Sequence, residues 1–321
     1  DAQNGENLRT ANKCMCANVA GAGVDLLGET QQLNVFQDGS TYYMLDASKP
    51  LQSAPSGNRA ILILDANNQT SEQITAGSIL QNLAFVTSSD PNSWANSHAV
   101  SAAFNLSETF DYYVQRHGRY SFDGKSNGFF AVVRVGNYPN ASWHNDHKYM
   151  LFGETDKWAG ALDIVGHEFT HGVTYSIGTN GVLDYQNQSG ALNEAFSDIF
   201  GEMVEARFVG TTDWIHGSQM VNPSRNMSNP PSLYFGNTTR RYPSKMAEFI
   251  AATDSFLDAF QFRDNGGVHL NSGIINRCFH LLAEGLPEAI GLLYAERIFY
   301  RCLTQHMKPQ SQFIDARLGC I

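Results

Sequence analysis

The chain has 321 residues, of which 42% are hydrophobic and 12% aromatic, so it can bury a large core and is not globally disordered. Its 31 acidic and 21 basic residues give a formal net charge of −10 without a basic stripe, so we expect no nucleic-acid partner. The longest apolar runs, such as residues 60–64, are far shorter than the roughly 18 residues that span a bilayer, so we expect no membrane partner.

The first half of the chain is predicted to be rich in β-strands. Short apolar or alternating runs lie at residues 42–45, 60–64 and 129–135, and Gly, Asn, Asp and Ser separate them. One helix is expected to interrupt the strands at about 95–116.

From about residue 160 the apolar pattern becomes helical. Apolar residues recur at steps of three and four from Leu192 to Met203, between Ser189 as a predicted N-cap and Gly210 as the predicted end. Further helices are expected at 272–283, at 291–305 and from 311 onward.

The sharpest motif is His167-Glu168-Phe169-Thr170-His171. On a helix, two His at i and i+4 project from one face, so both imidazoles can reach one Zn²⁺. Glu168 lies beside them, where it can take a proton from an attacking water, and Asp163 is expected to begin the helix. On this motif alone, two histidines that merely satisfy their hydrogen bonds remain an alternative.

The next predicted helix carries Glu194 and Asp198 at i and i+4. Two carboxylates four residues apart usually repel each other and mark a solvated face. They also suit a zinc site, with Glu194 as third ligand and Asp198 accepting the free N–H of a ligating His. Three protein ligands leave one position open for water, which is the arrangement of catalytic rather than structural zinc.

Together with residues 264–273, Asp-Asn-Gly-Gly-Val-His-Leu-Asn-Ser-Gly, these motifs resemble the thermolysin-like zinc metalloproteases. The likeness extends over nearly the whole chain and includes the segments at 111–113, 140–143 and 225–230. It implies an α+β fold, with a β-rich N-terminal domain over residues 1–162 and a mainly α-helical C-terminal domain over 163–321. The active-site cleft would lie between the two domains, with the helix that carries the zinc motif at its floor.

The resemblance also implies the composition of the zinc site. His167, His171 and Glu194 would be the ligands of one catalytic Zn²⁺. Asp198 would orient one ligating His and Asn193 the other.

Three residues would carry the catalytic steps. Glu168 would be the general base, and Tyr185 and His269 would stabilise the oxyanion that develops when water attacks a peptide carbonyl. Asp264 would orient His269. Since removing one oxyanion donor typically costs about 10²–10³ in rate, these residues should matter nearly as much as the ligands.

Substrate binding is implied for a further set of residues. Those that match the family's substrate-binding positions are Asn140, Ala141, Trp143 and Arg225. The family favours bulky apolar residues just after the scissile bond. Ile164 and Trp158 would line that pocket here, whereas Ser224 stands where a larger apolar residue is common, so the detailed preference stays open.

The family binds structural calcium, and part of its ligand set is present here. Asp163, Glu205 and Asp213 fall where the family's double-calcium site has carboxylates, but two further acidic positions are Ile215 and Ser218. Losing two of five carboxylates leaves too little charge for two adjacent ions, so we expect one Ca²⁺ there or none.

Other segments also depart from the family. Asp65-x-Asn67-x-Gln69 resembles a second calcium loop with one Asp replaced, so its affinity should be reduced. An insertion at 242–263 has a helical apolar pattern over 248–260 and would either rim the cleft or form a plain surface helix. The C-terminus stops about 25–30 residues before the family's usual end.

Five cysteines are too few for a scaffold held by disulfides. Cys14 and Cys16 would close a strained ring and are not expected to pair with each other. A disulfide among Cys278, Cys302 and Cys320 suits an oxidising compartment, and the sequence does not choose the pair.

The sequence is therefore interpreted as a secreted, monomeric zinc endopeptidase that acts on peptides or proteins and is made with its own prosegment. A zinc-stabilised binding module is the alternative from another class. Glu168, Tyr185 and His269 argue against it, because none of the three is needed merely to hold zinc. A zinc hydrolase with a substrate other than peptide is a middle case, which the backbone-binding Asn140, Ala141 and Arg225 disfavour.

Overall fold

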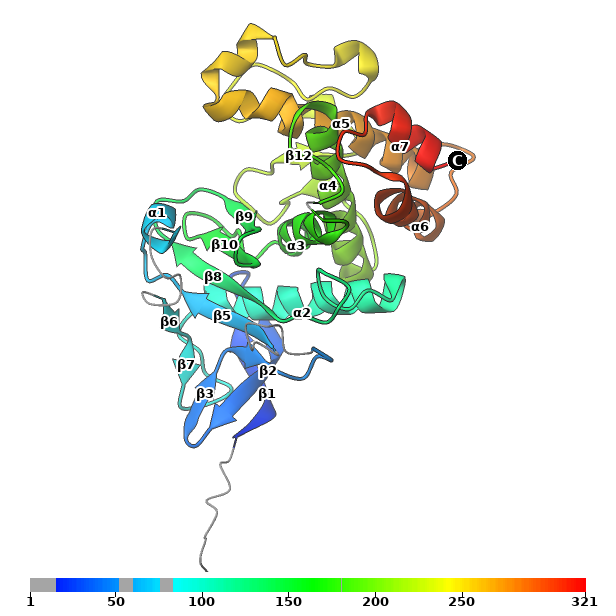
Figure 1. Cartoon of the computed structure of the whole chain (residues 1–321). Helices are drawn as coiled ribbons and strands as arrows, with labels where there is room; N and C mark the ends of the chain where they lie inside the picture. Colours follow the sequence, from blue (N-terminus) through cyan, green and yellow to red (C-terminus); the bar gives the residue numbers. More distant parts are fainter. Residues whose placement is uncertain (1–15, 52–59, 76–82, 180) are drawn as a thin grey trace, which may run out of the picture.

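The computed structural model describes residues 16–51, 60–75, 83–179 and 181–321, so Cys14 lies outside the described residues. Strands occupy the N-terminal half and helices the C-terminal half (Figure 1). The strands are β1 (Cys16–Val24), β2 (Thr30–Asp38), β3 (Thr41–Tyr43), β4 (Leu45–Asp46), β5 (Ile61–Asp65), β6 (Ala84–Phe85), β7 (Thr87–Ser88), β8 (Phe129–Val135), β9 (Ala141–His144), β10 (Tyr149–Gly153), β11 (Ile215–His216) and β12 (Arg225–Asn226). The α-helices are α1 (Ser71–Thr75), α2 (Ser97–His117), α3 (Leu162–Ser176), α4 (Asn187–Val209), α5 (Asp264–His280), α6 (Leu292–Arg301) and α7 (Phe313–Gly319).

Two sheets form the N-terminal half. One is antiparallel with the order β1-β2-β3-β7, and the other has the order β4-β5-β8-β10-β9, with β6 paired to β5. The second sheet is mixed, because β8 runs parallel to both β5 and β10. The apolar sequence Phe-Phe-Ala-Val-Val suits the central place of β8, whereas β9 lies at the edge of the sheet.

The predicted helix at 95–116 is confirmed as α2. Asn96 caps its N-terminus by accepting the N–H of Ala99, and Gly118 ends it in a left-handed conformation with φ 62°. Its buried face, which includes Val100, Leu106 and Phe110, joins the main core between sheet and helices.

Helices α3 and α4 pack against each other at the centre of the molecule (Figure 1). The contact is close because glycines face each other: a Cβ on Gly166 would lie 2.9 Å from the Cα of Gly201, and a Cβ on Gly201 would collide with the carbonyl oxygen of Asp163. Most residues of both helices are buried, so the side chains between them have a fixed geometry.

We expect Gly201→Ala to destabilise the protein by about 2–3 kcal/mol, because its methyl group meets backbone that cannot rotate away. Urea unfolding followed by circular dichroism measures the change. An unfolding midpoint equal to that of the unmodified protein would show that α3 and α4 can separate at no cost.

The start of α4 was predicted incorrectly. The helix begins at Asn187 after Gln186, and the hydroxyl of Ser189 donates to the carbonyls of Asp184 and Gln186 instead of capping the helix. The predicted end is confirmed, since Gly210 adopts φ 89° there.

Helix α5 and the insertion at 242–263 also differ from the sequence prediction. Segment α5 begins at Asp264, but residues 264–267 are left-handed, so its regular helix begins at Val268, four residues before the predicted Ser272. The insertion at 242–263 forms no α-helix. It contains the short 3-10 segments η2 (Met246–Glu248), η3 (Ser255–Ala259) and η4 (Gln261–Arg263). Its buried Ile250 and Leu257 pack with Leu270 of α5 in a small separate cluster.

The helices predicted at 291–305 and from 311 are confirmed. Helix α6 continues into the π-helical turn η6 (Cys302–His306), and α7 follows after a short connection. The predicted division at residues 162 and 163 coincides with the start of α3 and stays a prediction. In the part of the chain that the structure describes, no helix is long and apolar enough to cross a membrane.

Candidate metal centre and active site

Three predicted metal ligands converge from α3 and α4. The Nε2 atoms of His167 and His171 lie 3.0 Å apart. The Glu194 carboxylate lies 3.6 Å from the Nε2 of His167 and 3.4 Å from that of His171. The helical spacing of the two histidines thus brings both ring nitrogens to one carboxylate.

The other nitrogen of each imidazole is held by a partner on α4. Asp198 Oδ1 lies 2.8 Å from the Nδ1 of His167, and Asn193 Oδ1 lies 2.8 Å from the Nδ1 of His171. Because Nδ1–H donates to these oxygens, each Nε2 keeps its lone pair for a ligand. Both orienting residues were identified from the sequence.

The donor set fits a zinc ion. Tetrahedral ligands about 2.0–2.1 Å from a metal lie roughly 3.3 Å from one another, close to the spacing of the three donors. Glu194 is fully buried, and its Oε2 has no hydrogen-bond partner. A buried carboxylate oxygen without a partner is costly unless it binds a cation, so the site is suited to a metal.

Electrostatics in the site agree with a cation-binding carboxylate. Burial raises the pKa of Glu194, but the neighbouring imidazoles of His269 and His171 outweigh it and hold this pKa well below its usual value. Glu194 is therefore a carboxylate, as the ligand role requires.

Glu168 lies next to the ligand cluster and lines the same cleft. Its side chain is buried, and its Oε2 has no hydrogen-bond partner in the structure. A carboxylate in this position is free to accept a proton from a molecule bound in the cleft.

Tyr185 and His269 lie together next to the Glu194 carboxylate. The Tyr185 hydroxyl donates to Glu194 Oε1 and lies 3.2 Å from the Nε2 of His269. The Nδ1 of His269 is hydrogen-bonded to Asp264, which also accepts the backbone N–H of His269 at 3.2 Å. Helix α5 thus places His269 on its first regular turn, with its Nε2 directed into the site.

The cleft has a volume of about 740 Å³ and runs past the edge strand β9. Its lining includes all four predicted substrate-binding residues, Asn140, Ala141, Trp143 and Arg225. The ring of Trp143 packs against Gly172 of α3, where a Cβ would lie 2.8 Å from it. This contact fixes the edge strand relative to the helix that carries His167 and His171.

Arg225 is buried and forms an ion pair with Asp198. Its Nε and Nη2 donate to Asp198 at 2.7 and 2.6 Å. Burial lowers the pKa of Arg225, but the Asp198 carboxylate outweighs this effect and raises it above its usual value. Burial raises the pKa of Asp198, but the Arg225 guanidinium holds it well below its usual value. The ion pair therefore links the cleft to the residue that orients His167.

His216 is a cleft residue that sequence reasoning missed. The short strands β11 and β12 pair so that His216 stands opposite Arg225, and the ring of His216 lies 4.8 Å from that of His167. Its Nδ1 has no hydrogen-bond partner. A single histidine in a short loop has neither periodicity nor motif spacing, so no pattern in the sequence marks it.

An acidic cluster lies further along α3 and α4, where Asp163 stands one helical turn before His167 on the same face. Asp163, Glu202 and Glu205 have carboxylate oxygens within 4.8 Å of one another. Burial and the neighbouring Glu205 raise the pKa of Asp163 well above its usual value, and burial raises the pKa of Glu202 to about 8. Asp213 is not part of this group; its carboxylate accepts the N–H of Ile215 at 2.7 Å. Glu202 takes the third place and was not identified from the sequence.

The second predicted calcium loop contains an arginine. Arg134 of β8 donates to Asp65 through Nε at 3.0 Å and through Nη2 at 2.6 Å, and to Asn67 Oδ1 at 3.3 Å. The guanidinium thus supplies the positive charge that the loop oxygens would otherwise take from a cation.

Comparisons with known proteins match nearly the whole chain. A model of the thermolysin metallopeptidase catalytic domain matches residues 20–175, and one of the thermolysin metallopeptidase alpha-helical domain matches residues 181–321.

Individual relatives are about one-third identical. The chain is 34% identical to bacillolysin from Bacillus amyloliquefaciens over 100% of its own length and 56% of that protein. It is 33% identical to neutral protease NprE from Bacillus pumilus, covering 95% of this chain and 92% of the relative. The chain thus spans little more than half of bacillolysin but nearly all of NprE.

A solved structure supports the same fold. The precursor of protealysin, a metalloproteinase from Serratia proteamaculans, superposes with a TM-score of 0.66 at 30% identity. The match covers 80% of this chain and 79% of that chain.

Proposed function

The chain belongs to the thermolysin metallopeptidase family and has its α+β fold, and we propose that it is a zinc-dependent endopeptidase. One observation carries the proposal. His167, His171 and Glu194 converge in a cleft that also contains an unpartnered Glu168 and the pair Tyr185 and His269. A site that only held zinc would need none of the last three residues.

Each residue would have one task in peptide hydrolysis. His167, His171 and Glu194 would hold the zinc, which would polarise the carbonyl as a Lewis acid and lower the pKa of water. Glu168 accepts the proton of the attacking water and passes it to the leaving amine. Tyr185 and His269 donate hydrogen bonds to the oxyanion, and Asp264 holds His269 in the donating orientation.

The substrate would bind as an extended strand along β9. Its backbone would pair with the edge at Asn140 and Ala141, in the manner of strand addition to a sheet, and Arg225 would hold a substrate carbonyl. We further propose a preference for apolar residues just after the scissile bond, because Ile164 and Trp158 line the cleft. Ser224 and His216 line it as well and make this pocket more polar than an all-apolar one.

We also propose how the protein is made and where it acts. In line with the family resemblance, it would be secreted as a monomer and made with a prosegment that covers the cleft until cleavage. The similarity to a structure titled as a protealysin precursor supports the prosegment.

A peptide library tests the proposed activity together with its metal requirement. The native chain, the chain stripped of metal with 1,10-phenanthroline, and the stripped chain after Zn²⁺ is restored are each incubated with the library. Mass spectrometry then identifies the cut bonds. We expect cuts by the native and restored samples, with apolar residues enriched just after the cut, and none by the stripped sample.

Each failure has a separate meaning. No cuts by a sample with one bound zinc per chain would contradict the peptidase proposal. Cuts without apolar enrichment would remove only the proposed specificity.

We also propose that Asp163, Glu202 and Glu205 bind one structural Ca²⁺. Three buried carboxylates repel one another unless a cation lies between them, and Glu202 Oε2 has no hydrogen-bond partner. The Arg134 guanidinium makes a second ion at Asp65 unnecessary.

Calcium at about one hundred times its Kd is expected to raise the thermal midpoint of the zinc-loaded protein by roughly 3–5 °C. Glu202→Gln should abolish this increase, whereas Asp213→Asn, outside the cluster, should retain it. An equal increase in Glu202→Gln and the unmodified chain would place the ion elsewhere.

A further inference from the structure

We propose that Cys302 and Cys320 form a disulfide bond that fastens the C-terminal helix α7 to η6 and supports the segment that carries Tyr185. Cys278, Cys302 and Cys320 are free thiols in the structure. The proposal assigns two of them to one bond and leaves Cys278 unpaired.

The geometry brings the two thiols together at the end of α7. The Cys302 thiol donates to the carbonyl of Ala316 at 3.4 Å, and the backbone N–H of Cys320 donates to the same carbonyl at 3.0 Å. A Cβ placed on Gly319 would lie 3.0 Å from the sulfur of Cys302. Rotation of the two side chains toward each other can therefore bring the sulfurs to the roughly 2.05 Å of a disulfide.

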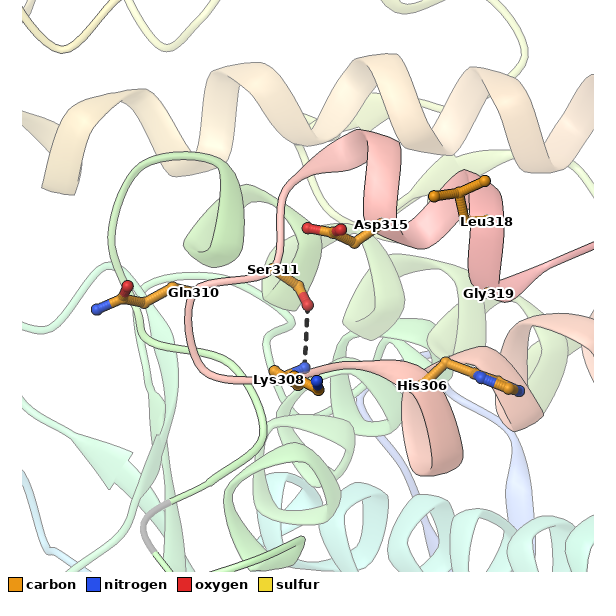
Figure 2. A pocket seen from close by; sticks show the side chains of 7 residues that line it. All are labelled: His306, Lys308, Gln310, Ser311, Asp315, Leu318 and Gly319. Carbon is orange, nitrogen blue, oxygen red and sulfur yellow. Dashed lines mark hydrogen bonds between the residues drawn. The ribbon is translucent and has the colours of Figure 1, made fainter.

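The segment between the two cysteines contacts the active-site region. Figure 2 shows its turn between η6 and α7, where the Lys308 backbone N–H donates to Ser311 Oγ at 3.0 Å. Two hydrogen bonds join this turn to the segment 184–188, which contains Tyr185. The carbonyl of Pro309 accepts the N–H of Asp184 at 2.7 Å, and the N–H of Phe313 donates to Gln188 at 2.9 Å. Closing the loop from Cys302 to Cys320 would hold these two contacts in place on both sides of Tyr185.

The bond requires an oxidant, which we assign to the class of low-molecular-weight disulfides. The half-buried Cys320 would exchange first and form a mixed disulfide, because Cys302 is fully buried. The Cys302 sulfur then attacks the sulfur of Cys320 and displaces the second small thiol. Two protein thiols lose two protons and two electrons, and one small disulfide becomes two thiols.

The bond itself is tested by mass spectrometry on the full-length Glu168→Gln variant, which avoids self-digestion. The protein is equilibrated with oxidised and reduced glutathione, alkylated, and digested without reduction. We expect a cross-linked peptide pair that contains Cys302 and Cys320, and an alkylated Cys278. Alkylation of both Cys302 and Cys320, or a bond from either to Cys278, would overturn the proposal. This measurement does not depend on the proposed peptidase activity.

The thermal midpoint gives a second, independent measurement. The oxidised protein is expected to melt roughly 3–5 °C above the same protein treated with a phosphine reductant, which avoids the removal of zinc by dithiols. Cys302→Ala/Cys320→Ala should show no such difference, and Cys278→Ser should retain it. A difference of the same size in the double variant would assign the effect to another bond.

The link to Tyr185 rests on the proposed function and has its own readout. Reduction is expected to lower kcat about threefold or more, because the oxyanion donor loses its support. In Tyr185→Phe, reduction should leave kcat unchanged. An equal loss in both enzymes would contradict the link to Tyr185, while the mass-spectrometric result would stand.

Discussion

Replacing Glu168 with Gln is expected to lower kcat for peptide hydrolysis by about 10³-fold, with little change in KM. Glutamine keeps the size of the side chain but cannot accept the proton of the attacking water, and general-base catalysis typically contributes 10²–10⁴-fold. Glu168 has no hydrogen bond through Oε2, so the substitution breaks no structural contact there. The measurement is steady-state hydrolysis of a quenched fluorescent peptide that the native chain cuts.

Two controls separate the role of Glu168 from damage to the zinc site. The variant should retain one zinc per chain, because Glu168 does not lie among the ligand group of His167, His171 and Glu194. Glu248→Gln, in the insertion outside the cleft, should leave kcat unchanged. Activity of the Glu168 variant within threefold of native, with zinc bound, would show that another residue is the base.

The geometry of the proposed zinc site was predictable because its signals are local. The i, i+4 spacing of His167 and His171 fixes their common face as soon as a helix is assumed, and the same holds for Glu194 and Asp198. The structure places all four where this reasoning requires. The carboxylate pair is buried, which excludes the alternative of a solvated face.

The structural features that sequence reasoning missed depend on long-range contacts or on residues with positive φ. Arg134 reaches Asp65 only because β5 and β8 lie side by side in parallel register, which no local pattern determines. The insertion has helical apolar spacing, yet Phe262 and Arg263 adopt positive φ, and its buried Ile250 and Leu257 pack in a small separate cluster. Tertiary contacts override local preference there, and the segment forms short 3-10 turns.

Asp198 connects protein stability to zinc affinity. It is fully buried and accepts hydrogen bonds from Arg225, from Asn276 at 2.7 Å and from His167. One carboxylate therefore neutralises a buried guanidinium and also fixes the imidazole of a proposed zinc ligand. The two roles predict different responses to substitution.

Asp198→Asn is expected to destabilise the zinc-free protein by about 3 kcal/mol, because it leaves the buried Arg225 without its main counter-charge. Zinc affinity should fall about 10–100-fold, because the bond that orients His167 weakens. The double variant Asp198→Asn/Arg225→Met removes the unpaired charge, so it should regain most of the stability but none of the zinc affinity. Urea unfolding of the metal-free proteins and zinc competition with a chromophoric chelator measure the two quantities. If the second substitution restored zinc affinity together with stability, Asp198 would act on the metal only through the fold, not through the orientation of His167.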